Sequence, residues 1–341
     1  MTLARLEEIL DRIRGARIGI AGDFCLDAYW DVDTGEREMS LETGKPTHGV
    51  RSQRYAPGGA GNVACNLAAL GAGAVRAFGV IGPDMFGREL ESLLAQRGID
   101  TSGLIAQEEG WQTAVYAKPY RAEQEQERID FGRWNAMQSE SRLDALVRRA
   151  LPGLHAFVVN QQLSTGIHSG AMIRALNGCA RENPSLPFVL DARTMNGSFT
   201  GMISKLNAKE AARVAAGPDG TAEGGDASPA AELLRRATRA ISARTGKPVF
   251  VTRGDEGILL FDGNRFADIP ALPLTGPVDT VGAGDTAVSA IAACLAAGGT
   301  PLEAGELANL AAAVTVQKLK ETGAATPEEI LRAARREGGS P

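Results

Sequence analysis

A glycine-rich turn followed by an aspartate is the part of the sequence best suited to chemistry. The stretch Asp279-Thr-Val-Gly-Ala-Gly-Asp285 leads directly into an apolar helical pattern. Backbone N–H groups at the start of a helix bind anions, and the helix dipole strengthens this attraction. Gly282, Ala283 and Gly284 would therefore hold a phosphoryl group, and Asp285 would be the general base for an attacking hydroxyl. The alternative is that Asp285 only stabilises the first turn of the helix.

A second glycine-rich stretch, Pro57-Gly-Gly-Ala-Gly-Asn62, suits a ligand with many hydroxyl groups. The backbone of Gly58 and Gly59 and the amide of Asn62 can donate to and accept from such hydroxyls. Residues 59–64 formally match a dinucleotide-binding pattern, but no buried strand is predicted before them, so we reject that interpretation. The sequence contains no GxxxxGK[ST], which excludes a P-loop.

Carboxylates and amides next to predicted strands form a third group of candidates. Asp23 and Asp27 follow the first predicted strand, where open α/β sheets bind ligands, and each could accept from neighbouring sugar hydroxyls or cap a turn. Asn207-Ala-Lys-Glu210 suits Mg²⁺ or its water ligands, and it equally resembles a helix capping box.

One further loop could lie under a nucleotide. It runs from Thr252 through Arg253 and Gly254 to Gly257 and joins two predicted strands. The alternative is an ordinary hairpin turn. The histidines and cysteines show no metal-site spacing.

Short apolar runs alternate with helical patterns along most of the chain, which predicts a mostly parallel sheet with helices on both faces. The expected strands are Ile18–Ala21, Val75–Ile81, Ala156–Val159, Phe188–Leu190, Val249–Thr252 and Ile258–Phe261. Besides an N-terminal amphipathic helix, the expected helices are Gly61–Leu70, Phe86–Gln96, Arg142–Leu151, Gly170–Arg181, Ala230–Arg244, Ala283–Ala297 and Pro301–Leu319.

Two polar stretches, residues 31–57 and 111–134, do not follow this alternation. They are too long for plain loops, so we expect a small β-lid inserted into a single domain that covers residues 1–341. We expect the lid to close over a sugar and to form a homodimer, because an isolated small sheet is marginally stable. Residues 217–229 are expected to be a surface loop without chemistry.

Composition narrows the function classes. The formal net charge is −5 over 341 residues, which argues against a general nucleic-acid binder. No apolar stretch is long enough to span a membrane and the first residues do not resemble a signal peptide, so we expect a cytoplasmic protein.

Taken in order, these motifs resemble the ribokinase-like (PfkB) carbohydrate kinase family, from about residue 18 to residue 330. Asp279–Ala292 fits the C-terminal signature of that family, and Gly58–Gly71 fits its N-terminal signature. The chain is most similar to D-glycero-β-D-manno-heptose 7-phosphate kinase domains, through Gly22–Trp30, Ser40-x-Glu42, Arg128–Phe131 and Asp191-x-Arg193.

The resemblance implies a ribokinase-like fold and an ATP-dependent kinase that phosphorylates a hydroxyl of a sugar or sugar phosphate. It places Arg128 and Asn160 on the substrate side, Arg193 at either the transferred or the substrate phosphate, and Asn309 at the adenine. Mg²⁺ would be held by Asn207 and Glu210 through water, and a monovalent cation remains open as a further cofactor.

Two departures leave the acceptor open, and one is that Leu41-Glu-Thr-Gly-Lys-Pro46 replaces the usual proline-rich piece of the lid. Heptose kinases typically carry Asp-Tyr-x-Lys-Gly where this chain reads Asn160-Gln-Gln-Leu-Ser-Thr-Gly166. The alternatives are therefore another kinase of the family, acting on ribose, fructose phosphate or a nucleoside, and a non-catalytic regulator that binds a sugar or nucleotide.

Overall fold

The computed structural model describes residues 1–33, 35, 38–122, 124–216, 231–319 and 323–338. The predicted surface loop at residues 217–229 lies outside this range. No helix in the described part is long and apolar enough to cross a membrane.

A nine-stranded sheet forms the centre of the molecule, in the order β14-β13-β12-β11-β10-β9-β1-β4-β5. The strands from β12 to β5 in this order run parallel, and β13 and β14 add an antiparallel edge. Their bounds are β1 Arg17–Gly22, β4 Ala74–Ile81, β5 Asp100–Ala106, β9 Ala156–Gln161, β10 Phe188–Ala192, β11 Ile203–Asn207, β12 Val249–Thr252, β13 Ile258–Phe261 and β14 Phe266–Ile269.

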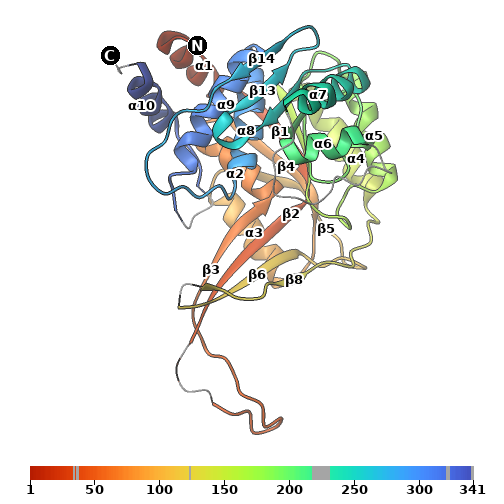
Figure 1. Ribbon diagram of the computed structural model, residues 1–341. Helices are drawn as coiled ribbons and strands as arrows, with labels where there is room; N and C mark the ends of the chain where they lie inside the picture. Colours follow the sequence, from red (N-terminus) through yellow and green to blue (C-terminus); the bar gives the residue numbers. More distant parts are fainter. Residues whose placement is uncertain (34, 36–37, 123, 217–230, 320–322, 339–341) are drawn as a thin grey trace.

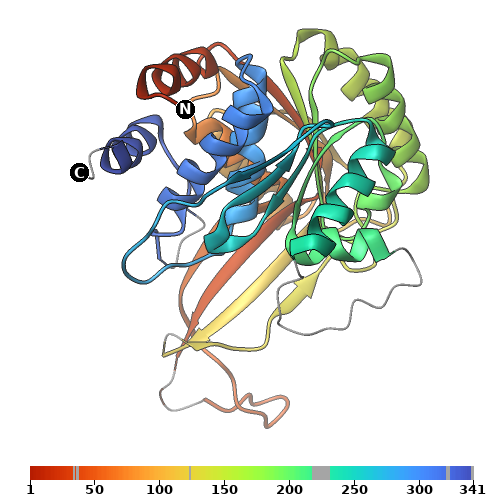
Figure 2. The same cartoon turned by 45° about the horizontal axis from the view of Figure 1, so that its top comes forward.

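Helices cover both faces of this sheet (Figures 1 and 2). One face carries α1 Leu3–Ile13, α2 Ala60–Ala69, α3 Met85–Ala95, α8 Ala283–Ala296, α9 Pro301–Thr315 and α10 Pro327–Gly338. The other face carries α4 Glu140–Ala150, α5 Gly170–Glu182, α6 Ala208–Ala216 and α7 Ala231–Thr245. Short 3₁₀ turns lie at Leu151–Gly153, Asn196–Ser198 and Gly254–Glu256.

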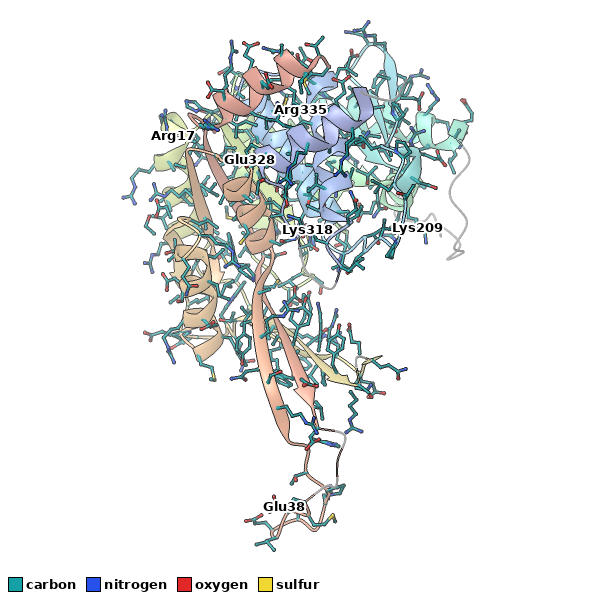
Figure 3. The ribbon with its side chains drawn as sticks, turned by 90° about the vertical axis from the view of Figure 1, so that its left-hand side faces the viewer. Arg17, Glu38, Lys209, Lys318, Glu328 and Arg335 are labelled. Carbon is teal, nitrogen blue, oxygen red and sulfur yellow. The ribbon has the colours of Figure 1, made fainter. Side chains whose placement is uncertain are left out.

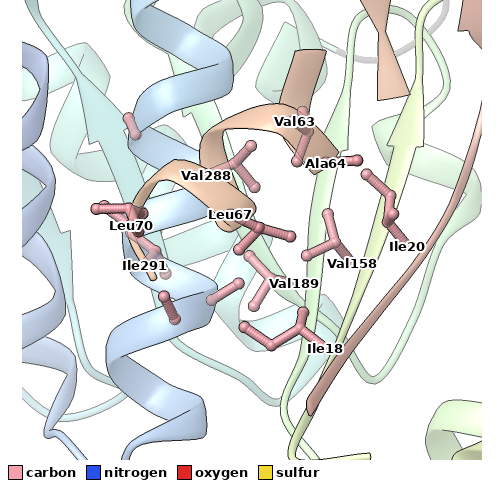
Figure 4. Close-up of a cluster of buried hydrophobic side chains, with 14 of the residues drawn as sticks. Ile18, Ile20, Val63, Ala64, Leu67, Leu70, Val158, Val189, Val288 and Ile291 are labelled. Carbon is pink, nitrogen blue, oxygen red and sulfur yellow. The ribbon is translucent and has the colours of Figure 1, made fainter. Parts of the chain in front are cut away.

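Alternating side chains on the strands divide the core between the two faces. Ile18 and Ile20 of β1 point toward α2 and α8, where they meet Leu67 and Val288 (Figure 4). The neighbouring Ala21 packs on the opposite face. A strand buried on both sides in this way reads as a continuous apolar run, which is why these central strands can be recognised in the sequence.

A second, five-stranded sheet extends away from the helical layers (Figure 1). Its strands are β2 Phe24–Val32, β3 Val50–Gly59, β6 Ala114–Arg121, β7 Gln124–Glu125 and β8 Ile129–Phe131. The connection between β2 and β3 reaches farthest from the body, with Glu38 near its end (Figure 3). This sheet brings together the polar stretches 31–57 and 111–134, which do not follow the predicted alternation of strands and helices.

The predicted fold class is confirmed: all of the predicted strands and helices are present, with small differences at their ends. The second sheet begins at Phe24, earlier than the expected residue 31, because β1 continues almost directly into β2. Residues 50–59 do form a strand before α2, but it pairs antiparallel with β2 in the second sheet. It therefore does not belong to a dinucleotide-binding βαβ unit.

Candidate active site

A cavity of about 460 Å³ lies where the second sheet meets the carboxyl ends of the central strands. The second sheet contributes Cys25, Asp27, Gly58, Gly59, Tyr116 and Lys118, and Arg128 lies just before β8. The strand ends and the residues after them contribute Gln162, Asp191, Arg193, Lys205, Asn207 and Glu210. The starts of α2 and α8 contribute Asn62, Thr280, Val281, Gly282, Gly284 and Asp285.

The turn before α8 has the geometry of an anion site. Gly282 has a φ of 82°, in the left-handed region that favours glycine, and α8 starts directly after it. A Cβ on Gly284 would lie 2.9 Å from Lys205 Nζ, so the absence of a side chain lets the ammonium approach the turn. The N–H of Ala283 donates to Thr280 O at 3.2 Å, and Ala283 itself does not line the cavity.

Asp285 is held by a chain of amides from α2. Asn62 Nδ2 donates to Asp285 Oδ2 at 2.6 Å, and Asn66 Nδ2 donates to Asn62 Oδ1 at 3.2 Å. Thr286 in turn donates to Asn66 Oδ1 at 2.9 Å. These bonds fix which way the Asn62 amide faces, so its NH₂ group points at the carboxylate of Asp285.

The environment of Asp285 suits a proton acceptor. Burial and the negative charge of Asp191 raise its pKa from 3.8 to about 6, against the opposing effects of Asn62, Lys205 and Arg193. A carboxylate with this pKa is a stronger base than an exposed one and is still mostly ionised near neutral pH.

A buried ion pair lies beneath the turn. Lys205 Nζ is 3.2 Å from both carboxylate oxygens of Asp191, and both side chains are less than 10% exposed. Burial lowers the pKa of Lys205, but the charges of Asp191, Glu210 and Asp285 outweigh it and raise the pKa above its ordinary value. Lys205 therefore stays charged beside the glycine-rich turn.

Asn207 and Glu210 form a reciprocal cap at the start of α6. Asn207 Oδ1 accepts from Glu210 N at 2.8 Å, and Glu210 Oε2 accepts from Asn207 N at 2.9 Å. Burial raises the pKa of Glu210, although the positive charge of Lys205 opposes it. Both residues also line the cavity, so capping and ligand binding are compatible here. Within the described ranges no three His, Cys, Asp or Glu side chains cluster as a metal site.

The side of the cavity formed by the second sheet is rich in cations. Lys118 Nζ is 2.8 Å from Asp27 Oδ1, and the Arg128 guanidinium pairs with Asp130 at 2.6 Å. Arg193 also lines the cavity, and its side chain makes no ion pair with any residue the structure describes. Lys118 and Arg128 are thus each paired with a carboxylate, whereas Arg193 is available to a ligand in the cavity.

Two of the predicted substrate residues lie behind the cavity wall. Asp23 is buried, and its carboxylate accepts from backbone N–H groups of residues 162–167. Asn160 is fully buried in β9, in register with Asp191, and neither polar atom of its amide has a hydrogen-bond partner in the described structure. Neither residue lines the cavity.

The predicted nucleotide loop forms the turn between β12 and β13. Thr252 is paired with Asn207 in the sheet, and Arg253 is 3.0 Å from Asp268 on β14. Gly254 begins a 3₁₀ turn and Gly257, with a φ of 83°, ends it. None of these four loop residues lines the 460 Å³ cavity.

Asn309, the expected adenine contact, lines a separate cavity of about 380 Å³. Its amide donates to Ile269 O at 3.0 Å and to Pro270 O at 2.9 Å. It thereby fixes the segment that follows β14, beside the apolar side chains of Leu272 and Leu310.

Sequence reasoning assigned no role to Lys118, Asp191 or Lys205. A signal for Lys205 was available, because residues two apart on a strand face the same side, and Lys205 lies two residues before Asn207. The same alternation places Lys118 beside Tyr116. Asp191 was noted only as part of a family-like motif, and its pairing with Lys205 needs the sheet order to be seen.

Comparison with solved structures supports the fold. The chain matches phosphofructokinase-2 from Escherichia coli in complex with potassium, at 18% identity and a TM-score of 0.72, over 95% of this chain and 99% of that one. It also matches Arabidopsis thaliana ribokinase complexed with ribose and ATP, at 20% identity and a TM-score of 0.68, over 94% and 98% of the two chains.

Similar curated proteins include the bifunctional protein HldE of Coxiella burnetii (strain Dugway 5J108-111), 30% identical over 92% of this chain and 62% of that protein. HldE of Caulobacter sp. (strain K31) is 31% identical over 100% of this chain and 66% of that protein. The chain thus spans less than two thirds of the length of the first of these relatives. The family model for pfkB family carbohydrate kinases matches residues 29–329. The predicted resemblance is therefore confirmed, and the chain belongs to the pfkB family of carbohydrate kinases.

Proposed function

We propose that this kinase transfers the γ-phosphate of ATP to a hydroxyl of a phosphorylated sugar, with an acceptor similar to heptose 7-phosphate. The observation that carries the proposal is the make-up of one cavity. Asp285 and the α8 turn come from the central body, Lys118 and Arg128 come from the second sheet or lie just before β8, and Arg193 follows β10.

The transfer side contains a base and an anion site next to each other. Asp285 would take the proton of the acceptor hydroxyl as its oxygen attacks the phosphoryl group. The N–H groups at the start of α8 and the ammonium of Lys205 would stabilise the charge on that group. Asn62 would keep the Asp285 carboxylate facing the hydroxyl.

A magnesium ion fits the oxygen donors on this side. Glu210 uses Oε2 in the α6 cap, which leaves Oε1 for a water of the ion, and Asn207 lies beside it in the cavity wall. Mg²⁺ usually keeps several waters and binds few protein groups together with substrate phosphates, so a full protein cage is not needed. When bound, the ion supplies charge neutralisation for the phosphates of ATP. Binding of a monovalent cation as a further cofactor stays a prediction.

The acceptor side favours a sugar that already carries a phosphate. The Arg193 guanidinium faces the cavity without a carboxylate partner, and arginine binds phosphate through two parallel hydrogen bonds. Asp27, Asn62 and the backbone of Gly58 and Gly59 supply acceptors and donors for sugar hydroxyls. A free pentose or a nucleoside would leave Arg193 without a counter-charge, whereas Lys118 and Arg128 are already paired with Asp27 and Asp130.

The second sheet would act as a lid over the sugar and as a dimer interface. A groove of about 510 Å³ on this sheet is lined by Trp30, Val50, Pro119 and Ile129 among others. Val50 and Ile129 are about half exposed, which leaves apolar surface for a second copy to cover. A small sheet of this kind gains stability from such packing.

An acceptor panel tests the function. ADP release would be measured with ATP and heptose 7-phosphate, the same heptose without phosphate, fructose 6-phosphate, ribose and a nucleoside. We expect the phosphorylated sugars to exceed the unphosphorylated ones at least tenfold in kcat/KM, as the loss of a charge-assisted contact predicts. Equal or better turnover of ribose or the nucleoside would exclude a sugar phosphate acceptor. Nucleotide binding without ADP release would indicate a non-catalytic regulator.

A further inference from the structure

Asp23 occupies the single position between the central sheet and the second sheet. Strand β1 ends at Gly22 and β2 begins at Phe24. The backbone of Asp23 is fixed on both sides, because its N–H donates to Asn160 O at 3.1 Å and its carbonyl accepts from Ala60 N at 3.0 Å. Asp23 therefore lies at one of the connections between the two sheets, beside a second one where β3 runs directly into α2.

The Asp23 carboxylate organises the loop that follows β9. Its Oδ2 accepts from the N–H groups of Gln162 and Leu163, both at 2.8 Å, and its Oδ1 accepts from Ile167 N at 2.9 Å. His168 Nδ1 lies 3.4 Å from Oδ1, and both side chains are fully buried. The loop wraps closely around the carboxylate, since a Cβ on Gly166 would lie 2.0 Å from Oδ1.

An ionised carboxylate is the group that this arrangement needs. Burial alone would raise the pKa of Asp23, but the nearby His168 and the N–H groups of Leu163 and Gln162 outweigh it and lower the pKa. A carboxylate accepts with both oxygens. An amide would turn a donating NH₂ group toward at least one backbone N–H.

The loop connects this buried centre to the cavity and to the second sheet. Gln162 lines the cavity next to the β3 end at Gly59. Three residues later, Thr165 Oγ1 donates to Arg133 O at 2.9 Å, shortly after β8. The loop held by Asp23 therefore touches the acceptor side at one point and the base of the second sheet at another.

We propose that Asp23 is a positioning residue, which holds the 162–168 loop so that Gln162 faces the acceptor and the second sheet keeps its orientation over the cavity. This proposal rests on the proposed function, because it takes the Gln162 side of the cavity as the acceptor site. It differs from the sequence-based expectation that Asp23 itself binds the sugar, since the carboxylate is fully used by the loop.

Asp23→Asn tests the kinetic consequence, with heptose 7-phosphate as the probe, or fructose 6-phosphate if the acceptor panel selects it. We expect the KM for the sugar to rise about tenfold, as for a lost hydrogen bond to a charged group, while the KM for ATP stays within about twofold. Gln162→Ala should also raise the KM for the sugar. In the double variant the KM should rise by less than the product of the two single increases, because both substitutions act through one contact. Asp144→Asn is the matched control, since Asp144 pairs with Arg148 on α4, away from the cavity.

Hydrogen exchange tests the loop directly and without a substrate. In Asp23→Asn the amides of Gln162, Leu163 and Ile167 should exchange faster, whereas the amides of β9 and β10 should keep their protection. Should Asp23→Asn fail to fold, Gly166→Ala displaces the same loop while leaving Asp23 in place, and it should give the same rise in the sugar KM.

A lower melting temperature with an unchanged sugar KM and unchanged exchange at these amides would overturn the proposal and leave Asp23 a purely structural residue. Additive effects of Asp23→Asn and Gln162→Ala would also overturn it. The proposed function fails separately, if the parent protein phosphorylates no sugar in the panel; the exchange experiment then still decides the role of Asp23.

Discussion

Replacing Asp285 with Asn removes the proposed base while changing little else. The side chain keeps its size, and its amide oxygen can still accept from Asn62 Nδ2. Losing a general base typically lowers the rate by about 10²–10⁴, which corresponds to roughly 2.7–5.4 kcal/mol of transition-state stabilisation. We expect this loss in kcat, with ATP affinity unchanged within a few-fold, because the base acts on a proton of the acceptor and does not hold the nucleotide.

The same substitution should stabilise the protein. The pKa of Asp285 is about 6 in the folded state and 3.8 without the protein environment. A carboxyl group with a raised folded pKa stabilises the fold while protonated, and this contribution is lost as the pH rises from about 4 through 6. Above pH 7 the buried charge therefore lowers the free energy of unfolding by at most about 3 kcal/mol. This is an upper limit, because solvent reaching the cavity would screen part of the charge. Asp285→Asn removes this cost.

The assay measures three quantities on one preparation: kcat, the KM for ATP and the melting temperature at pH 5 and pH 8. For a chain of this length, about 3 kcal/mol corresponds to a rise of roughly 4 °C, and the rise should be larger at pH 8 than at pH 5. The parent enzyme should also lose activity below about pH 6, with the acid limb set by Asp285. The pH-dependent gain in stability separates a buried charge from a simple change in helix capping.

Asp84→Asn is the control, because Asp84 Oδ1 caps α3 through Gly87 N, its Oδ2 accepts from Thr113 N, and the residue does not line the cavity. Asn caps a helix nearly as well as Asp, so this variant should keep its rate. If Asp285 were also only a cap, Asp285→Asn would behave in the same way. A folded Asp285→Asn enzyme that retains more than about a tenth of the parent rate would refute the assignment of Asp285 as the base.

Four further outcomes follow from the same geometry. Arg193→Met should lower kcat/KM about 10–100-fold for phosphorylated acceptors and leave unphosphorylated ones nearly unchanged; a uniform loss would contradict a phosphate contact. Asn62→Asp places a second carboxylate beside Asp285 and should move the acid limb of the pH–rate profile upward, and an unmoved limb would show that the Asn62 contact is unimportant. Lys205→Met leaves the buried Asp191 unpaired and should destabilise the fold by about 3–5 kcal/mol in denaturant titrations, with smaller losses counting against a buried ion pair. Ile129→Lys should shift the mass measured by light scattering toward the monomer, and an unchanged dimer would place the interface elsewhere.

The sequence was most informative where one continuous segment contains both the structure and the chemistry. The Gly-Ala-Gly-Asp turn and the apolar helix after it are adjacent in the chain, so their spacing already predicts an anion site with a carboxylate beside it. The contact that orients this carboxylate joins residues 223 positions apart, Asn62 and Asp285, and spacing alone cannot reveal it.

Strands with a chemical role were the hardest to predict. Strand β11 reads Ile203-Ser-Lys-Leu-Asn, and the buried Ser204 and Lys205 interrupt the apolar run that identifies a central strand. Its lysine is tolerated inside the fold because Asp191 lies in register on β10. The rule that buried strands are apolar therefore failed at a position that lines the proposed site, where such departures are expected.

The charges of the cavity also indicate how two anionic substrates could be told apart. On the transfer side, Asp191, Glu210 and Asp285 face the cations Lys205 and Arg193, and burial raises the pKa of both Glu210 and Asp285. From the second sheet, Lys118 and Asp27 line the cavity, with Arg128 just before β8. Under the proposed function, the Mg²⁺ that accompanies the nucleotide lies beside the carboxylates of the first group, whereas an acceptor phosphate without a metal ion pairs with Arg193. Like charges brought together in the reverse arrangement would be unfavourable on both sides, so the charges alone favour one orientation of the two substrates.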